Sequence, residues 1–134
     1  MDNQTAYLAV RAHFSAPGAD FSRDDHGDCY YRHPEDLAAG LHPERVRKCA
    51  AGCLMPDDLY DKVQAEDDIE GTAWNSVVDK LFAIDPDTME NLFGNVDVEL
   101  MNEMQHAHDN SNDIPTLILR LDQIAYNYHL KVPA

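Results

Sequence analysis

The chain has 134 residues, of which 44% are hydrophobic, so it is long enough for one domain (1–134) with a real core, and disorder is not expected. Its 25 acidic and 10 basic residues give a formal net charge of −15, which argues against direct nucleic-acid binding, because that affinity comes from lysine and arginine. No apolar run approaches the ~20 residues that span a bilayer, the first residues do not form a signal peptide, and three cysteines suit no secreted disulfide framework. We therefore expect a cytoplasmic protein that does not bind membranes.

Apolar spacing predicts a helix over 4–15, which Ala16-Pro17-Gly18 ends. Residues 29–32 and 44–48 are typical of two short strands, which we expect to pair. A short helix is predicted over 49–54, with a break before Pro56. The acidic segment 61–71 is expected to be an exposed loop. Further helical segments are predicted at 74–82, 89–94, 98–108 and 114–128. The predicted fold class is therefore α+β, mostly α, with helices packed around a short antiparallel two-stranded ribbon.

The acidic excess is concentrated in the second half of the chain. Residues 1–55 hold eight acids and six bases, whereas residues 56–134 hold seventeen acids and four bases. A basic surface on a partner protein is the best electrostatic match for such a segment. The alternative is that the charge only keeps the chain soluble.

Two of the three cysteines, Cys49 and Cys53, lie one turn apart on the short predicted helix, and Cys29 lies on the neighbouring strand. Between them, Gly52 costs about 1 kcal/mol relative to alanine inside a helix, which indicates that a neighbouring backbone approaches closely there. In the structural interpretation of this corner the three thiols are free and inert, and Cys53 is buried.

A metal site is the second interpretation of the corner. It would use Cys29, Cys49 and Cys53 with His26 or His33, but the paired spacing typical of zinc ligands is missing. We therefore expect no metal and no cofactor.

A nucleophile is the third interpretation. Cys49 would lie at a helix N-terminus directly after basic residues, and both features lower the pKa of a thiol. The base would be His106 or His108 with Asp109, within the run "HAHDN". The same histidines equally suit the last turn of a helix, where they complement the helix dipole.

Three segments share a spacing of distinctive residues: G-x-C-x-Y-R at 27–32, K-C-A-x-G-C-L-x-P-D-x-x-Y-D at 48–61 and M-Q-x-x-H-D-N at 104–110. Together they resemble an uncharacterised family of small phage and bacterial proteins with a C-A-x-G-C-L-[IM]-P motif, over residues 27–128. Members commonly have Glu-Gly after the tyrosine motif, whereas Glu70-Gly71 here follow an acidic insertion. The resemblance implies a phage or mobile-element setting and brings no activity.

In that setting we expect a small acidic accessory protein that binds and inhibits a host or defence protein with a basic surface, in host takeover or counter-defence, rather than an enzyme. We assign binding to the carboxylates of Asp57, Asp58, Asp61, Glu66, Asp67, Asp68 and Glu70. The alternative is a cysteine-dependent enzyme or small-ligand-binding protein. Its site would be the corner formed by Cys49, Cys53, His106, His108 and Asp109.

Overall fold

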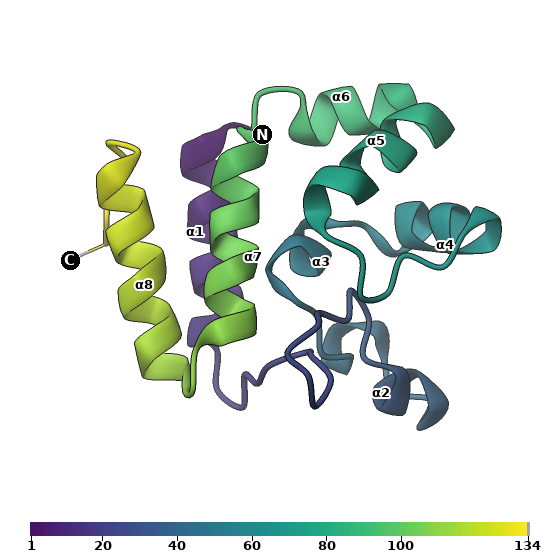
Figure 1. Cartoon of the computed structure of the whole chain (residues 1–134), viewed down its shortest axis with the longest axis horizontal. Helices are drawn as coiled ribbons and strands as arrows, with labels where there is room; N and C mark the ends of the chain where they lie inside the picture. The colour runs from purple at the N-terminus through teal and green to yellow at the C-terminus, as the bar shows by residue number, and fades with distance from the viewer. Residues whose placement is uncertain (134) are drawn as a thin grey trace.

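The computed structural model describes residues 1–133, and the chain is mostly helical there (Figure 1). In chain order the elements are α1 (Asn3–Ser15), α2 (Pro34–Ala38), the 3₁₀ helix η1 (Pro43–Arg45), α3 (Ala50–Leu54), α4 (Asp57–Glu66), α5 (Trp74–Ile84), α6 (Pro86–Phe93), α7 (Val98–Asn110) and α8 (Ile114–Asn127). The six helical segments predicted from the sequence are all present. No helix in this part of the chain is both long and apolar enough to cross a bilayer.

Three long helices, α1, α7 and α8, lie side by side on one side of the molecule (Figure 1). Helix α8 packs against α1 and α7 at the outer edge, and the short α3 also packs against α1 and α7. Helix α1 begins after Asp2, whose carboxylate caps it by accepting the Thr5 N–H at 2.8 Å. The side of α1 that faces the core consists of Ala6, Tyr7, Val10 and Phe14, all fully buried.

Helices α4, α5 and α6 occupy the opposite side of the molecule (Figure 1). Helix α5 contacts α4, α6 and α7, so it joins this group to the three long helices. Its first residue, Trp74, is the single tryptophan of the chain. The Trp74 side chain is buried, and its ring centroid lies 5.1 Å from that of Phe93 on α6.

The predicted two-stranded ribbon is wrong, because residues 1–133 contain no β-strand, and the fold class is mostly α rather than α+β. Residues 44–48 begin inside η1, where Pro43 favours the first helical turn. Residues 29–33, which we call the central strip, are not helical, bend at Tyr31 and Arg32, and do not form a ladder with that segment. One backbone bond joins the two segments, His33 N–H to Arg47 O, and Cys49 N–H, just beyond the second segment, donates to Tyr30 O.

The backbone of the central strip is satisfied from several directions instead. Tyr30 N–H donates to Ser22 O at 2.8 Å, and Gly71 N–H donates to Cys29 O at 2.9 Å. The N–H of Tyr31 donates to the side-chain carboxylate of Glu70 at 2.8 Å. Buried backbone groups need partners, but these partners need not form a second strand.

Gly52 of α3 lies directly against the central strip. A Cβ atom at Gly52 would lie 2.5 Å from Tyr31 O and 3.0 Å from Tyr31 Cα, which is closer than real Cβ atoms approach backbone. The close backbone approach predicted from the sequence is confirmed.

The acidic segment 61–71 is only partly the exposed loop that the sequence predicted. Residues 61–66 belong to α4, whose Leu59, Tyr60 and Val63 are buried, and Ile69 beyond the helix is fully buried. The surrounding charges had obscured this helical spacing.

The approach at Gly52 predicts the effect of a Gly52→Ala substitution. The added methyl group would meet backbone atoms that cannot move aside, so we expect the free energy of unfolding to fall by about 2 kcal/mol. Urea denaturation would measure this loss.

Gly18→Ala is the matched control, because no atom lies within 4 Å of the new Cβ. The only destabilisation expected is the strain of an alanine at the positive φ of +79°. We expect it to cost less than Gly52→Ala. If Gly52→Ala instead stabilised the protein, as helix propensity alone would dictate, the close approach would be contradicted.

Candidate functional site

Three of the carboxylates assigned to binding, Asp57, Asp67 and Asp68, form local structural contacts. Asp57 accepts from Nε of Arg32 at 3.0 Å. Asp67 forms a hydrogen-bonded ion pair with Lys80, which lowers the pKa of Asp67. Asp68 accepts the backbone N–H two residues further on at 3.0 Å. These three side chains therefore have local partners whether or not they meet another molecule.

Glu70 turns inward against the central strip. Its Oε1 accepts the Tyr31 N–H at 2.8 Å and its Oε2 accepts the Arg32 N–H at 3.3 Å. Burial disfavours the charged carboxylate and raises the pKa of Glu70 from 4.5 to about 7, although the two hydrogen bonds oppose this shift. Glu70 thus supplies acceptors that a second strand would have supplied in the predicted ribbon.

The remaining three carboxylates, Asp58, Asp61 and Glu66, are exposed on α4, and we call them the α4 acidic face. None of them forms an ion pair with another side chain of residues 1–133. The only lysine of α4, Lys62, is already paired with Asp85 at 2.7 Å. The α4 acidic face therefore presents charge that nothing in the described chain neutralises.

Arg32 of the central strip has a buried guanidinium that is surrounded by acceptors. Its Nη1 donates to Gly52 O at 2.8 Å and its Nη2 donates to Met55 O at 2.6 Å. These carbonyls lie at the end of α3, where helical C=O groups lack partners within the helix, so Arg32 caps α3. The guanidinium also pairs with Asp57 and lies 4.9 Å from the centroid of the Tyr60 ring.

Cys49 caps the beginning of the short α3 and Cys53 lies within it, and both are free thiols. Cys49 is fully buried, and its Sγ accepts the Gly52 N–H at 3.4 Å. Cys53 is half-buried rather than buried, and its Sγ donates to Ala50 O at 3.1 Å. Burial raises the pKa of Cys53 to about 12, and burial together with the neighbouring Cys29 thiol raises the pKa of Cys49 well above its ordinary value. The thiolate that a nucleophile requires is therefore disfavoured at both positions.

His108 is buried in the last turn of α7, and protein groups occupy both of its ring nitrogens. Nε2 accepts a hydrogen bond from the Ser22 N–H at 3.0 Å. The ring proton is therefore assigned to Nδ1, whose N–H donates a hydrogen bond to Asp109 Oδ1 at 2.8 Å. Within residues 1–133 no hydrogen bond joins His108 to Cys49. The structure brings His108 and Asp109 together as expected, but it does not assemble the cysteine–histidine pair that a nucleophilic mechanism needs.

Gln105 and Ser22, to which the sequence pattern assigned no role, complete this buried polar network. Gln105 Nε2 donates to Asp109 Oδ1 at 2.9 Å, and its Oε1 accepts the Ala51 N–H at 3.0 Å, so it connects α7 to α3. Gln105 and Asp109 lie one helical turn apart, a signal that was available in the sequence. Ser22 lies in a polar segment with no comparable signal. His106 is exposed and takes no part in the network.

A polar cleft of about 340 Å³ opens between residues 71–75 and α7. Its lining includes Asp28, Cys29, Trp74, Asn75, Asn102 and Asp109. No lysine or arginine of residues 1–133 lines it, so the cleft suits a small ligand that donates hydrogen bonds or carries positive charge.

The residues named for a metal site, Cys29, Cys49 and Cys53 with His26 or His33, are not gathered into one. Across residues 1–133 no group of three or more histidine, cysteine, aspartate or glutamate side chains is arranged to hold a metal ion.

Neither a protein-family model, nor a curated protein, nor a solved structure matches the chain. The resemblance to small phage and bacterial proteins stays a prediction.

The buried Glu70 carboxylate predicts a pH dependence of stability. The folded chain holds the Glu70 proton up to about pH 7, whereas the unfolded chain releases it near 4.5, so the unfolded state binds fewer protons between these values. This group should therefore lower the free energy of unfolding as the pH rises through that window, by up to about 3 kcal/mol. Denaturant titrations at several pH values would measure the slope.

Glu70→Gln should remove that part of the slope, because the amide does not titrate. Glu66→Gln is the control: this exposed carboxylate lies on the same segment, and its loss should leave the slope as in the wild type. Equal slopes in all three proteins would contradict the assignment of the pH dependence to Glu70.

The raised pKa values of Cys49 and Cys53 and the burial of Cys49 predict slow alkylation. With a pKa of about 12, the thiolate fraction of Cys53 is about a thousandfold below that of an ordinary cysteine, and Cys49 is in addition closed to solvent. We expect iodoacetamide near pH 6 to label neither residue quickly in the folded protein, and mass spectrometry of peptides would locate any label. The same chain in denaturant is the control, where all three cysteines should react alike. Rapid labelling of Cys49 in the folded chain would restore the nucleophile interpretation.

Proposed function

We propose that this chain is a protein-binding module that uses the α4 acidic face to engage a basic surface on a partner protein. In the phage setting that the motif resemblance implies, the partner is a host or defence protein in the cytoplasm of the host cell, and binding inhibits it. One observation carries the proposal. Both lysines of helices α4–α7 are already neutralised, Lys62 by Asp85 and Lys80 by Asp67, while the α4 acidic face has no cation of its own.

The distribution of charge among the helices supports the same proposal. Helices α4–α7 together hold ten acidic residues and two lysines, whereas α1 and α8 together hold one acidic residue and two arginines. Of these helices, α4, α5 and α6 lie on the side of the molecule away from α8, whereas α7 packs against α8 (Figure 1). Like charges on one surface repel and cost stability, so a role in binding explains their retention better than solubility alone.

The alternative of a cysteine-dependent enzyme has less support, because Cys49 is buried and both nitrogens of His108 are bonded to other groups. Small-ligand binding is the second candidate function. The observation that favours it is the polar cleft, whose lining includes Asp28 and Asp109 and no lysine or arginine of residues 1–133.

The proposal predicts the effect of neutralising the α4 acidic face. In the triple variant Asp58→Asn, Asp61→Asn and Glu66→Gln, long-range attraction to a basic partner is lost, so association at low salt should slow by about tenfold while dissociation changes less. The wild-type chain would first be used to isolate a partner from host lysate, and surface-immobilised binding kinetics would then be measured with that partner.

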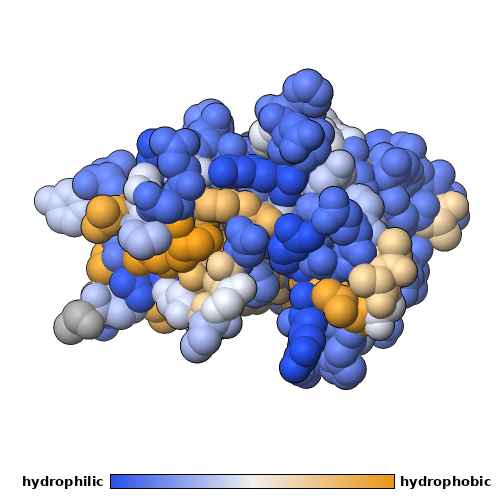
Figure 2. Space-filling model, turned by 90° about the horizontal axis from the view of Figure 1, so that it is seen from below, coloured by the Kyte–Doolittle hydropathy of each residue, from blue (hydrophilic) through white to orange (hydrophobic). Residues whose placement is uncertain are grey.

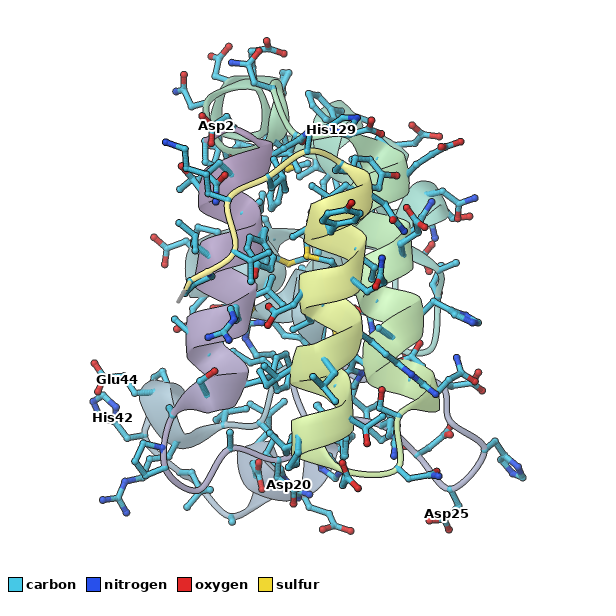
Figure 3. The ribbon with its side chains drawn as sticks, turned by 90° about the vertical axis from the view of Figure 1, so that its left-hand side faces the viewer. Asp2, Asp20, Asp25, His42, Glu44 and His129 are labelled. Carbon is cyan, nitrogen blue, oxygen red and sulfur yellow. The ribbon has the colours of Figure 1, made fainter. Side chains whose placement is uncertain are left out.

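A second triple variant, Asp20→Asn, Asp25→Asn and Glu44→Gln, is the matched control. It removes the same number and kinds of carboxylate, and Figure 3 places these residues at one end of the helices, near where α8 begins. The control should bind like the wild type. Equal association rates for both triple variants would mean that the net charge matters and the α4 acidic face does not.

A further inference from the structure

The outer side of α8 is uncovered and carries two large exposed apolar side chains beside polar ones such as Gln123. Leu119 is 70% exposed and Tyr126 is 73% exposed. Together with the exposed Pro115 they lie on one side of the helix, because positions four and eleven residues apart recur on the same side. Figure 3 views the molecule from this side and shows α8 in front, with no other helix over it.

A groove of about 570 Å³ runs beside this stripe, between α8 and the end of α1. Phe14, Ile118 and Leu119 contribute to its mainly apolar lining. Figure 2 shows an apolar area on this part of the surface, where α1 ends and α8 begins. The two charged residues of the groove, Arg11 and Asp122, neutralise each other through bonds of 2.8 and 3.2 Å. We call the groove together with Pro115, Leu119 and Tyr126 the α8 apolar face.

The charge around this face differs from that of the rest of the chain. The net charge is −15, yet the only acidic residue within α1 and α8 is Asp122, which is paired. Figure 3 places the labelled acids Asp2, Asp20, Asp25 and Glu44 at the ends of the helices rather than over the middle of α8. Two copies of this chain repel each other at most orientations, and this repulsion is smaller at the α8 apolar face, whose groove holds one carboxylate, the paired Asp122, with Asp20 and Asp113 at its end.

We propose that the α8 apolar face binds a second copy of this chain in a two-fold symmetric dimer. In such a contact the same surface serves both copies, so Leu119 of each copy can enter the groove of the other. A head-to-tail contact would instead place the apolar groove against the acidic helices of the next copy and remove carboxylates from water, which is costly. The symmetric dimer keeps both α4 acidic faces on its outside, because α4 and α8 lie on opposite sides of the chain (Figure 1).

Sedimentation velocity on the full chain, over a wide range of protein concentration, tests the proposal. We expect a species of twice the chain mass that becomes more populated as salt rises, because salt screens the repulsion between two acidic copies and leaves the apolar contact intact. This salt dependence is opposite to the one expected for a basic partner on the α4 acidic face, so the two proposals can fail separately.

Leu119→Glu should raise the dimer dissociation constant by about tenfold or more, because it removes a buried apolar side chain and places a charge in the contact. Leu37→Glu is the matched control: Leu37 is 48% exposed on α2, away from this face, and the substitution changes the net charge equally. Tyr126→Glu is a second variant in case Leu119→Glu disturbs folding, which thermal unfolding would show.

The proposal is overturned if the wild type stays monomeric at high protein concentration and high salt. It is also overturned if Leu37→Glu weakens the dimer as much as Leu119→Glu and Tyr126→Glu do. Species that grow beyond a dimer with concentration would indicate head-to-tail contacts and would contradict the two-fold arrangement.

Discussion

The guanidinium of Arg32 is withdrawn from water, and a charge in that position is stable only when its N–H groups find acceptors. Gly52 O, Met55 O and the Asp57 carboxylate meet this need, so one side chain fixes the end of α3 and the beginning of α4. The backbone of the same residue donates to Glu70, which fixes the acidic segment beyond α4. The central strip, two helices and the segment that follows them are thereby positioned by contacts that converge on one arginine.

Apolar spacing predicted six of the helices because each of them buries one side of itself, and that periodicity is local information, whereas residues 61–66 of α4 were expected to be a loop. The ribbon could not be judged in the same way. The sequence of 29–32 is typical of a strand, but whether such a segment pairs depends on distant groups, here the Glu70 side chain and the backbone of Ser22. Gly52 was informative because glycine destabilises a helix, so its presence there needed an explanation. The explanation is the backbone of Tyr31, which leaves no room for a Cβ atom at this position. In the corner of cysteines and histidines, His108 and Asp109 are neighbours in sequence and form a hydrogen bond. Cys49 and His108 form none, and whether two residues so far apart in sequence meet cannot be judged from local sequence.

The polar network around His108 has a structural logic of its own. Ser22 N–H, the imidazole, the Asp109 carboxylate, Gln105 and the backbone of Ala51 form one connected set of hydrogen bonds from a loop through α7 to α3. Such networks specify a unique packing when every member is satisfied. In this chain the network uses both ring nitrogens of His108 and the Asp109 carboxylate, the groups best suited to catalysis. The exposed groups include carboxylates on α4 and apolar side chains on α8. This arrangement favours the proposal that the chain binds other proteins over the proposal that it catalyses a reaction.

The position of Trp74 gives the chain an optical reporter of its own. As the single tryptophan, it is buried at the beginning of α5 against Phe93, and it also borders the polar cleft. Its emission therefore comes from one known place and depends on how dry that place is. A molecule that enters the cleft, or water that enters as α5 and α6 separate, would change the colour or intensity of that emission without any added label. Separation of α5 from α6 could thus be followed by tryptophan fluorescence, with no contribution from α1, α7 or α8, which contain no tryptophan.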